Sequence, residues 1–507
     1  MTVARTWAVA LSGLRGDLVE VEADVSSQTP EFSIIGLADK ALGEAGRRVR
    51  NACANRALDL PKRRITVNLS PASLPKRGSG FDVAIAVAAL ATTVKMDAAH
   101  VADTVHLGEL GLDGRLRPVP GILPAVVAAR RAGHARVVVP APNAAEAALV
   151  EGIEVFAPTC LAEVVRWHGG ASDAPDLPAV STPAPSEDGE EILELADVVG
   201  QPEAVDALVV AAAGGHHLLM SGPPGAGKTM LARRLPGILP PLDDEAALSV
   251  ASVRSLAGES VTQLSRIPPF ESPHHGATAA ALIGGGSGVV RPGAIARASE
   301  GVLFLDEGGE FPASVLDALR QPLENGTIQV HRSGVTATYP ARFQLVVATN
   351  PCPCGQYGVV GGACDCAPQA IRRYTRRLSG PLLDRIDIDL RLQRVSSARM
   401  QDDTRGVTTA EARRTVARAR QRAAERWRDT PWRRNADVPG TWLRGPAAPA
   451  SGVLEPLDSA LRRGALTLRG YDRLLRVAWT VADIAGHDDL QLDDVGRALY
   501  LRRAAGA

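Results

Sequence analysis

The first 170 residues alternate between short apolar runs and longer stretches in which apolar residues recur every three or four positions. The short runs are rich in Val, Ile and Leu, which favour strands, whereas the spaced pattern is typical of helices packed on a sheet. We therefore expect an α+β or α/β domain over residues 1–170. The predicted strands are 7–11, 18–25, 32–37, 64–69, 105–110 and 136–140, and the predicted helices are 38–57, 80–94, 121–132 and 143–151.

The pattern changes twice after this domain. Residues 171–191 are rich in Pro, Ser and acidic side chains, which cannot bury enough apolar surface to fold, so a linker is expected. Residues 192–394 form a strand–loop–helix series, which predicts a doubly wound parallel sheet. Residues 395–507 are expected to form a helical lid domain. Its predicted helices are 410–427, 471–484 and 492–504, with an irregular stretch between the first and the second.

Composition and charge narrow the class of protein. A chain of 507 residues exceeds what one core supports, so several domains are expected. Basic and acidic residues balance at 56 each, so any polyanion site has to be a local patch. The N-terminal apolar run is interrupted by Arg15 and Asp17, and no run of about 18 apolar residues follows. We therefore expect a cytoplasmic protein without a membrane partner.

A glycine-rich segment between an apolar run and a helical run predicts a phosphate site. Its glycines let successive backbone N–H groups converge on phosphates, and the dipole of the following helix adds to this attraction. Lys228 is expected to reach the β- and γ-phosphates of ATP, and Thr229 to ligate Mg²⁺. The segment has the Walker A pattern in the strand-to-helix context that it requires: Gly222, Pro223, Pro224, Gly225, Ala226, Gly227, Lys228 and Thr229.

A second segment, at 301–307, supplies the acidic half of this site. Its apolar residues predict a buried parallel strand, and the strand ends in Asp306 and Glu307. Doubly wound sheets bind ligands at this carboxyl edge. Asp306 is expected to hold Mg²⁺ through water, and Glu307 to orient and activate the attacking water.

Several segments resemble the magnesium-chelatase-like AAA+ family, and within it the YifB/ComM group. The resemblance covers the whole chain except the linker, and it implies an ATPase whose ComM member is a competence-associated DNA helicase. Gly308 and Gly309 depart from the Leu-Pro that usually follows the acidic pair, although both carboxylates remain. The segments that carry the resemblance are 270–275, 281–286, 291–293, 339–355 and 379–387.

The resemblance implies roles for three further residues. Asn350 follows an apolar strand and matches the residue that senses the γ-phosphate. Arg385 is placed at the start of another strand and resembles the arginine finger that completes a neighbouring subunit's site. Arg469 begins a lid helix and matches the sensor-2 position. The residues themselves also allow Asn350 to be a strand cap and Arg385 to be a surface side chain paired with Asp384 or Asp387.

The spacing of the two Walker segments indicates an insertion. The lysine and the aspartate are 306 − 228 = 78 positions apart, more than one crossover needs. The surplus includes a glycine-rich stretch at 282–293, and a second hairpin is predicted at 326–340. In related motors both elements line a hexameric pore, where His331 and Arg332 could contact phosphates. A plain exposed hairpin is the alternative.

Four cysteines lie close together after Asn350. Their CxC–x9–CxC spacing would satisfy a tetrahedral Zn²⁺ with four thiolates, although CxC is tighter than the usual CxxC. Reduced free thiols and a disulfide pair remain as alternatives. The four residues are Cys352, Cys354, Cys364 and Cys366.

The N-terminal domain resembles the proteolytic domain of Lon proteases at 74–90 and 108–133. Those enzymes use a Ser–Lys dyad, but Gly80 and Leu123 stand at the two positions here, and neither can attack a carbonyl or take up a proton. Ser79 is adjacent, but it is displaced by one residue. We therefore expect a Lon-like fold without peptidase activity that serves as an assembly or interaction module.

Three functions agree with these features. The favoured one is a homo-hexameric DNA translocase or helicase that acts on single-stranded or branched DNA. The arginine-rich segments 371–377 and 410–427 support it, although such segments are more often solvated faces. The alternatives are a protein-remodelling ATPase that works through the Lon-like domain and the motor subunit of a magnesium chelatase. The last fits poorly, because such subunits typically lack both the Cys cluster and the fused domain.

Overall fold

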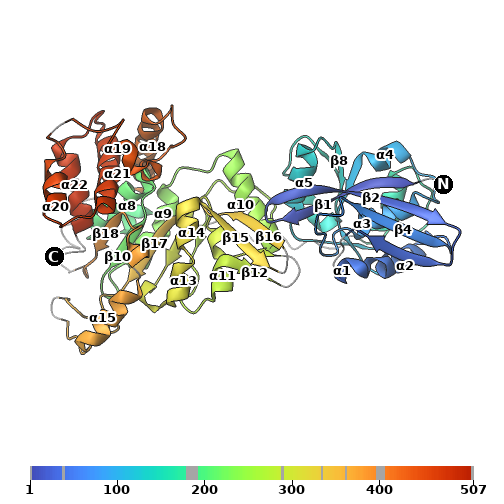
Figure 1. Ribbon diagram of the computed structural model, residues 1–507, viewed down its shortest axis with the longest axis horizontal. Helices are drawn as coiled ribbons and strands as arrows, with labels where there is room; N and C mark the ends of the chain where they lie inside the picture. The colour runs from blue at the N-terminus through green and yellow to red at the C-terminus, as the bar shows by residue number, and fades with distance from the viewer. Residues whose placement is uncertain are drawn as a thin grey trace.

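The N-terminal sheet, the central sheet and the C-terminal helices follow one another along the long axis of the molecule (Figure 1). This arrangement is seen in a computed structural model of the chain. The described residues are 3–36, 40–178, 192–286, 290–332, 335–359, 362–378, 380–395, 406–450 and 452–503.

The N-terminal part is built on a mixed seven-stranded sheet in the order β3-β4-β2-β1-β5-β8-β9. Strands β1, β2 and β4 pair antiparallel, and the remaining pairs are parallel. In β4 every second side chain is buried, which is the pattern of a strand with one face on a core. The bounds are β1 Ala4–Ser12, β2 Arg15–Ser26, β3 Glu31–Ile35, β4 Arg64–Ser70, β5 Thr104–His106, β8 Arg136–Val138 and β9 Glu154–Phe156.

Helices cover this sheet, and α3 is buried along its whole length. Five of the six predicted strands and the helices at 80–94 and 121–132 are confirmed, but β9 was not predicted. The other helices are α2 (Ala45–Ala54), α4 (Ala98–Ala102), α5 (Ile122–Arg131), α6 (Ala144–Ala147) and α7 (Leu161–Trp167), with α3 at Asp82–Leu90.

Three predicted elements of this part differ from the structure. The strand expected at 105–110 divides into β5 and β6 (Glu109–Leu110), because Gly108 has a φ of 138°. The helix expected at 38–57 divides into α1 (Lys40–Gly43) and α2, and its residues 38 and 39 lie outside the described residues. The helix expected at 143–151 is only the four-residue α6, which follows a 3₁₀ turn.

The central part is a five-stranded sheet in the order β11-β14-β17-β10-β18, and each of its pairs is parallel. Its strands are β10 Leu218–Ser221, β11 Phe270–Glu271, β14 Val302–Leu305, β17 Gln344–Thr349 and β18 Ile388–Arg391. Both faces of the sheet are buried, as the predicted doubly wound arrangement requires.

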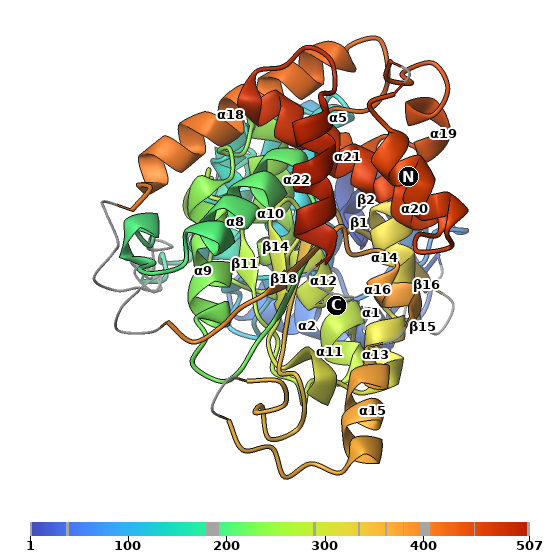
Figure 2. The same cartoon turned by 90° about the vertical axis from the view of Figure 1, so that its left-hand side faces the viewer.

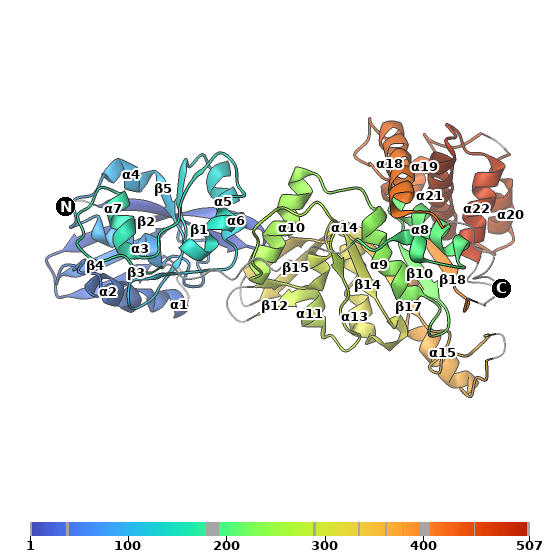
Figure 3. The same cartoon turned by 180° about the vertical axis from the view of Figure 1, so that it is seen from behind.

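Successive residues of β14 show how the two faces are covered. Val302 and Phe304 belong to a core with α8 (Pro202–Gly214) and α9 (Lys228–Ile238), which lie on one face of the sheet (Figure 3). Leu303 and Leu305 belong to a core with the opposite helices. Those helices include α10 Asp244–Ala257, α11 Ala279–Ile283, α12 Ala294–Arg297, α13 Ala313–Asp317 and α14 Arg320–Asn325.

Two hairpins project from the central part. Strands β15 (Thr327–Arg332) and β16 (Val335–Pro340) form the hairpin predicted at 326–340, whose turn residues 333 and 334 lie outside the described residues. In the glycine-rich stretch, β12 (Gly284–Gly285) pairs with β13 (Arg291–Pro292). Both predicted hairpins are therefore confirmed as antiparallel pairs.

The C-terminal part is helical, as predicted. The three predicted helices are confirmed as α18 (Thr409–Arg426), α21 (Leu468–Ala485) and α22 (Leu492–Arg503). Helix α18 begins with a capping box between Thr408 and Glu411. The stretch expected to be irregular contains the short helix α19 (Gly440–Leu443), and α20 (Glu455–Arg462) was not predicted.

The N-terminal and central parts are in direct contact. The amide of Gly121, at the start of α5, donates to the carbonyl of Ser255 in α10 over 3.1 Å. Gly13 of the β1–β2 turn forms a parallel bridge with Thr338 of β16, and a Cβ at Gly13 would lie 2.2 Å from the Thr338 oxygen. A glycine is therefore required at this junction.

Candidate nucleotide-binding site

The Walker A residues form the loop between β10 and the first turn of α9. Gly225 and Gly227 adopt positive φ angles of 78° and 82°, which glycine accepts without steric cost. A Cβ at Gly222 would lie 2.6 Å from the Leu392 carbonyl oxygen, so this position also excludes a side chain. The loop opens on a groove of about 1040 Å³ whose lining includes Gly222, Pro223 and Asn350. Backbone amides and a helix N-terminus thus meet at one edge of the sheet, where they can bind phosphate.

Lys228 lies at the centre of this loop and is only 9% exposed. Its amine donates to the carbonyls of Gly222 over 2.6 Å and Pro223 over 3.0 Å, and to Oδ1 of Asn350 over 3.0 Å. Burial lowers the pKa of Lys228, and the nearby carboxylates of Asp306 and Glu307 oppose this shift. The contact places the predicted sensor amide directly beside the Walker A lysine.

The acidic pair lies at the carboxyl end of the buried strand β14. The hydroxyl of Thr229 donates to Oδ2 of Asp306 over 2.8 Å. A hydroxyl and a carboxylate at this separation are hard oxygen ligands of the kind that Mg²⁺ prefers beside phosphates, so the donor set fits this ion. The structure therefore brings the two predicted metal ligands together.

Glu307 has a partner that sequence reasoning did not assign to the site. Its φ is 53°, which is uncommon outside glycine, and its amide donates to Oδ1 of Asp306 over 3.0 Å. Nδ1 of His275 lies 3.0 Å from Oε2 of Glu307, and both side chains are partly exposed. His275 was noted only as part of a family segment. The two residues are 307 − 275 = 32 positions apart, so the sequence carried no local signal of their contact.

The four clustered cysteines converge beside the phosphate loop. Their sulfur atoms all lie within 4.8 Å of one another, and Cys352 Sγ is 3.3 Å from Cys354 Sγ and 3.8 Å from Cys364 Sγ. Zinc–thiolate bonds of about 2.3 Å in a tetrahedron place sulfurs about 3.8 Å apart, so the cluster fits Zn²⁺ with little movement. Gly355, which follows Cys354, packs against Pro224 so closely that a Cβ would lie 2.5 Å from the proline ring. Cys366 supplies the fourth sulfur atom of this set.

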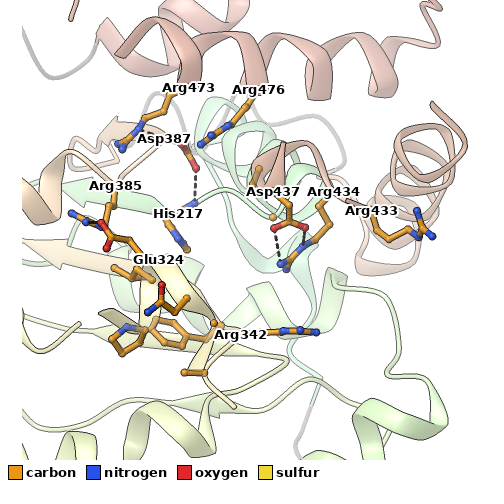
Figure 4. A pocket seen from close by; sticks show the side chains of 18 of the residues that line it. His217, Glu324, Arg342, Arg385, Asp387, Arg433, Arg434, Asp437, Arg473 and Arg476 are labelled. Carbon is orange, nitrogen blue, oxygen red and sulfur yellow. Dashed lines mark hydrogen bonds and ion pairs between the residues drawn. The ribbon is translucent and has the colours of Figure 1, made fainter. Parts of the chain in front are cut away.

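A second, arginine-rich cleft of about 1030 Å³ lies between the central sheet and the C-terminal helices (Figure 4). Its lining includes Arg385 and Arg469. Arg385 forms an ion pair with Glu324, and Arg469 Nη1 lies 3.3 Å from Asp384 Oδ2. Glu324 is therefore one ion-pair partner of Arg385. Arg385 also precedes β18 by three residues, because a turn after α16 (Gly380–Leu383) delays the strand until Ile388.

The cleft and the phosphate loop lie at opposite edges of the parallel sheet. Arg385 precedes β18 and His217 precedes β10, whereas the Walker A loop follows β10. Four residues at about 3.3 Å each separate the two edges by about 13 Å along β10. Arg385 consequently cannot reach the phosphate loop of its own chain.

Asp387 lines this cleft and interacts with basic side chains from two parts of the chain. Burial alone would raise its pKa, but the hydrogen bond and charge of His216, with further charge from His217 and Arg473, hold the pKa of Asp387 well below its usual range. Its carboxylate also accepts the His217 amide over 3.3 Å. Arg473 of α21 donates to the Ile386 carbonyl over 3.0 Å. These contacts join the C-terminal helices to the sheet edge that carries Arg385.

The two glycine-bearing segments of the N-terminal domain also meet. Gly80 and Gly121 line one small cavity of about 160 Å³, closed on the other side by Leu256 of α10 and Ala337 of β16. The hydroxyl of Ser79 donates a hydrogen bond to the carboxylate of Glu109. A Cβ at Gly80 would meet nothing within 4 Å, so its place is open space.

In the described part of the chain, none of the helices combines the length and the apolar character that a membrane crossing requires.

Three family models match the chain. The model described as magnesium chelatase, subunit ChlI, matches residues 194–400, subunit ChlI of Mg-chelatase matches 21–143, and the ChlI C-terminal model matches 406–502.

Full-length relatives are similar to the chain over nearly its whole length. An uncharacterized protein of Mycobacterium tuberculosis is 47% identical over 99% of both chains. Competence protein ComM of Haemophilus influenzae is 39% identical over 99% of this chain and 98% of its own. YifB of Escherichia coli is 38% identical over 97% and 96%, respectively. The magnesium-chelatase 38 kDa subunit of Cereibacter sphaeroides, by contrast, is 29% identical over only 30% of this chain.

Proposed function

Because the chain belongs to the YifB/ComM group of magnesium-chelatase-like proteins, we propose that it is an ATP-hydrolysing AAA+ motor that acts on DNA. The observation that carries the ATPase assignment is the convergence of Lys228, Thr229, Asp306 and Asn350 at the carboxyl edge of the central sheet. The match to ComM over nearly the full chain favours this assignment over a chelatase subunit, whose match covers under a third.

Each residue of the site has a separate task in the proposed reaction. The Walker A amides and Lys228 bind the phosphates of ATP, and Thr229 and Asp306 hold Mg²⁺, which neutralises developing phosphate charge when bound. Glu307 orients the attacking water and accepts its proton, and His275 fixes the direction of the Glu307 carboxylate. Asn350 keeps Lys228 in place and senses the γ-phosphate.

The arginine-rich cleft supports action between subunits. Arg385 and Arg469 lie at the edge of the sheet remote from their own phosphate loop, and both are held by acidic partners. In a ring of identical subunits, of which we propose six, this edge meets the neighbour's phosphate loop. Arg385 then acts as the arginine finger and Arg469 as sensor 2, with the C-terminal helices as the lid.

The cysteine cluster is proposed to hold one structural Zn²⁺. A loop that packs on Pro224 and follows Asn350 has to be rigid for both residues to keep their places, and four thiolates tie it together. The N-terminal domain is proposed to be Lon-like without peptidase activity, since Ser79 lies beside Glu109 rather than a lysine.

The DNA assignment is tested by the response of the ATPase to DNA. We expect single-stranded or forked DNA to raise the rate of phosphate release, and added salt to remove the rise, because counterions compete for the phosphate contacts. Lys228→Ala protein is the control for contaminating ATPases. A rate that no form of DNA changes would contradict the DNA assignment and favour protein remodelling.

A further inference from the structure

Helix α15 (Pro368–Arg377) projects from the body of the central part, directly after the cysteine cluster (Figure 2). Its last turns carry four arginines and one buried tyrosine. We propose that α15 is a contact site for the sugar–phosphate backbone of a single DNA strand, and that Tyr374 transmits this contact to the ATP site. The proposal rests on the DNA-dependent ATPase activity proposed above, and it identifies α15 as the site through which DNA changes the ATPase rate.

The outer face of α15 is free to bind a polyanion. Arg372, Arg373 and Arg376 are exposed, and no hydrogen bond or ion pair of their side chains is found among the described residues. Arg372 and Arg376 are four positions apart, so their Cβ atoms lie about 5–6 Å from each other on one face. Exposed guanidinium groups that are not neutralised by carboxylates match the charge and the donor geometry of successive phosphates.

The other arginine-rich segment, α18, is different in this respect. Arg413 and Arg420 donate to the carbonyls of Gly237 and Ala212, and Arg422 and Arg426 pair with Asp488 and Asp483. Four of its arginines therefore hold the C-terminal helices in place. Only Arg414 and Arg418 are exposed there without a partner among the described residues. The structure thus favours α15 over α18 as the DNA contact.

The inner face of α15 rests on the catalytic elements. The Tyr374 side chain is 4% exposed, and burial raises the pKa of its phenol, whereas the neighbouring Thr349 side chain and Asn350 backbone lower it. Its ring occupies the space above Gly309, where a Cβ would lie 2.5 Å from the ring. Arg377 donates to the Gly309 carbonyl over 3.0 Å. Gly308 and Gly309 follow Glu307 directly, so one helix touches both the sensor strand and the loop of the catalytic acid.

A DNA strand bound along Arg372, Arg373 and Arg376 would shift the position of α15. Tyr374 would move with the helix and so change its contacts with Asn350 and Gly309. This arrangement also explains the glycine at position 309. A larger residue at position 309 would displace the tyrosine ring and separate the helix from the site.

The first test compares Arg372→Gln/Arg373→Gln/Arg376→Gln with the matched exposed pair Arg414→Gln/Arg418→Gln. A fluorescein-labelled single-stranded oligonucleotide is titrated with full-length protein at several salt concentrations. Each lost phosphate contact lowers the slope of log K against log salt by about 0.7, so the triple variant should lose about 2. Its ratio of DNA-stimulated to basal ATPase should fall towards one, whereas the control pair should keep the wild-type slope and ratio.

The second test uses Tyr374→Phe, which keeps the ring over Gly309 but removes the hydroxyl. We expect DNA affinity close to wild type together with a reduced stimulation ratio. Wild-type stimulation in this variant would overturn the role of Tyr374.

The outcomes separate this inference from the proposed function. Wild-type protein that neither binds nor responds to DNA would overturn both. If DNA stimulates the wild-type ATPase, two results would overturn the role of α15 alone. Either the triple variant behaves like wild type, or the control pair is impaired as much as the triple variant. A triple variant that fails to assemble, as judged by light scattering, while binding DNA with the wild-type salt slope would show that α15 is a subunit contact instead.

Discussion

In the proposed reaction, Lys228 serves nucleotide binding and Glu307 serves hydrolysis. Lys228 donates to two carbonyls and to the Asn350 amide oxygen, so its loss removes the donor from three acceptors. Glu307 lies farther out, beside His275, where it can contact water. Removing either side chain should therefore stop hydrolysis for a different reason.

We expect Lys228→Ala to abolish nucleotide binding, because the phosphates lose their principal cation. Glu307→Gln should bind ATP but hydrolyse it about 10²–10⁴-fold more slowly, since an amide cannot accept the proton of the attacking water. A fluorescent ATP analogue measures binding, and phosphate release measures turnover. Appreciable hydrolysis by Glu307→Gln would show that Glu307 has been misassigned.

Asp389 of β18 predicts a pH dependence of stability. Burial raises its pKa to about 6, and its Oδ1 has no hydrogen-bond partner among the residues that the structure describes. The native carboxyl therefore keeps its proton at a pH where the unfolded one, with a pKa of about 3.9, has lost it. The native state binds more protons between these values, so stability falls as the pH rises from about 4 to about 6 and the loss is complete above that.

Asp389→Asn should remove this loss. Between pH 5 and pH 8 the variant should gain about 1 kcal/mol relative to wild type, or about 2–4 °C in the melting temperature. Thermal unfolding followed by tryptophan fluorescence at the two pH values measures the difference. Identical pH profiles would mean that the carboxyl is solvated in solution.

At the scale of elements, the cysteine loop ties the sensor strand to the phosphate loop. Cys352 follows Asn350 by two residues, and Gly355 packs on Pro224. If Zn²⁺ fixes this loop, its removal should affect hydrolysis without unfolding the distant N-terminal sheet.

Metal analysis of purified protein should give about one Zn²⁺ per chain, and Cys354→Ser should lower this ratio substantially, because one of four thiolates is lost. Cys53→Ala, which alters a cysteine buried in the N-terminal part, is the control and should retain the metal. Equal zinc in wild type and Cys354→Ser would remove the proposal.

Elements with a strong local signal were predictable from the sequence. The Walker A loop and β14 combine apolar runs with glycines or acids at fixed spacing, and both stand where they were expected. Short elements such as β9 and α19 were missed, because three or four residues carry too little periodicity. The contact of His275 with Glu307 was missed for another reason: it depends on how distant segments pack.

At the scale of the whole molecule, an arginine finger that is separated from its own phosphate loop would make activity a property of the proposed ring. Lys228→Ala protein keeps its finger but has no working site, whereas Arg385→Ala protein keeps its site but has no finger. Each alone should be nearly inactive, since a missing finger costs about 10³–10⁵ in rate.

Mixing the two variants should restore part of the wild-type ATPase, because a Lys228→Ala subunit can donate Arg385 to an intact neighbour. Phosphate release is measured at a fixed total protein concentration over a range of mixing ratios. Subunits that exchange without any recovery would show that Arg385 does not act between neighbours.

The Gly13–Thr338 bridge and the Gly121–Ser255 hydrogen bond limit where the chain can be divided into separately expressed fragments. The predicted linker at 171–191 suggests a place to divide the chain. The N-terminal and central parts, however, also contact each other directly. Arg56 and Arg115 donate to the carbonyls of Pro175 and Pro178, so the start of this stretch belongs to the N-terminal part. A fragment that begins after residue 191 would expose Leu256 and Ala337 to water. We therefore expect the fragment without the N-terminal part to aggregate when it is expressed alone. Co-expression with the N-terminal fragment should reduce this aggregation.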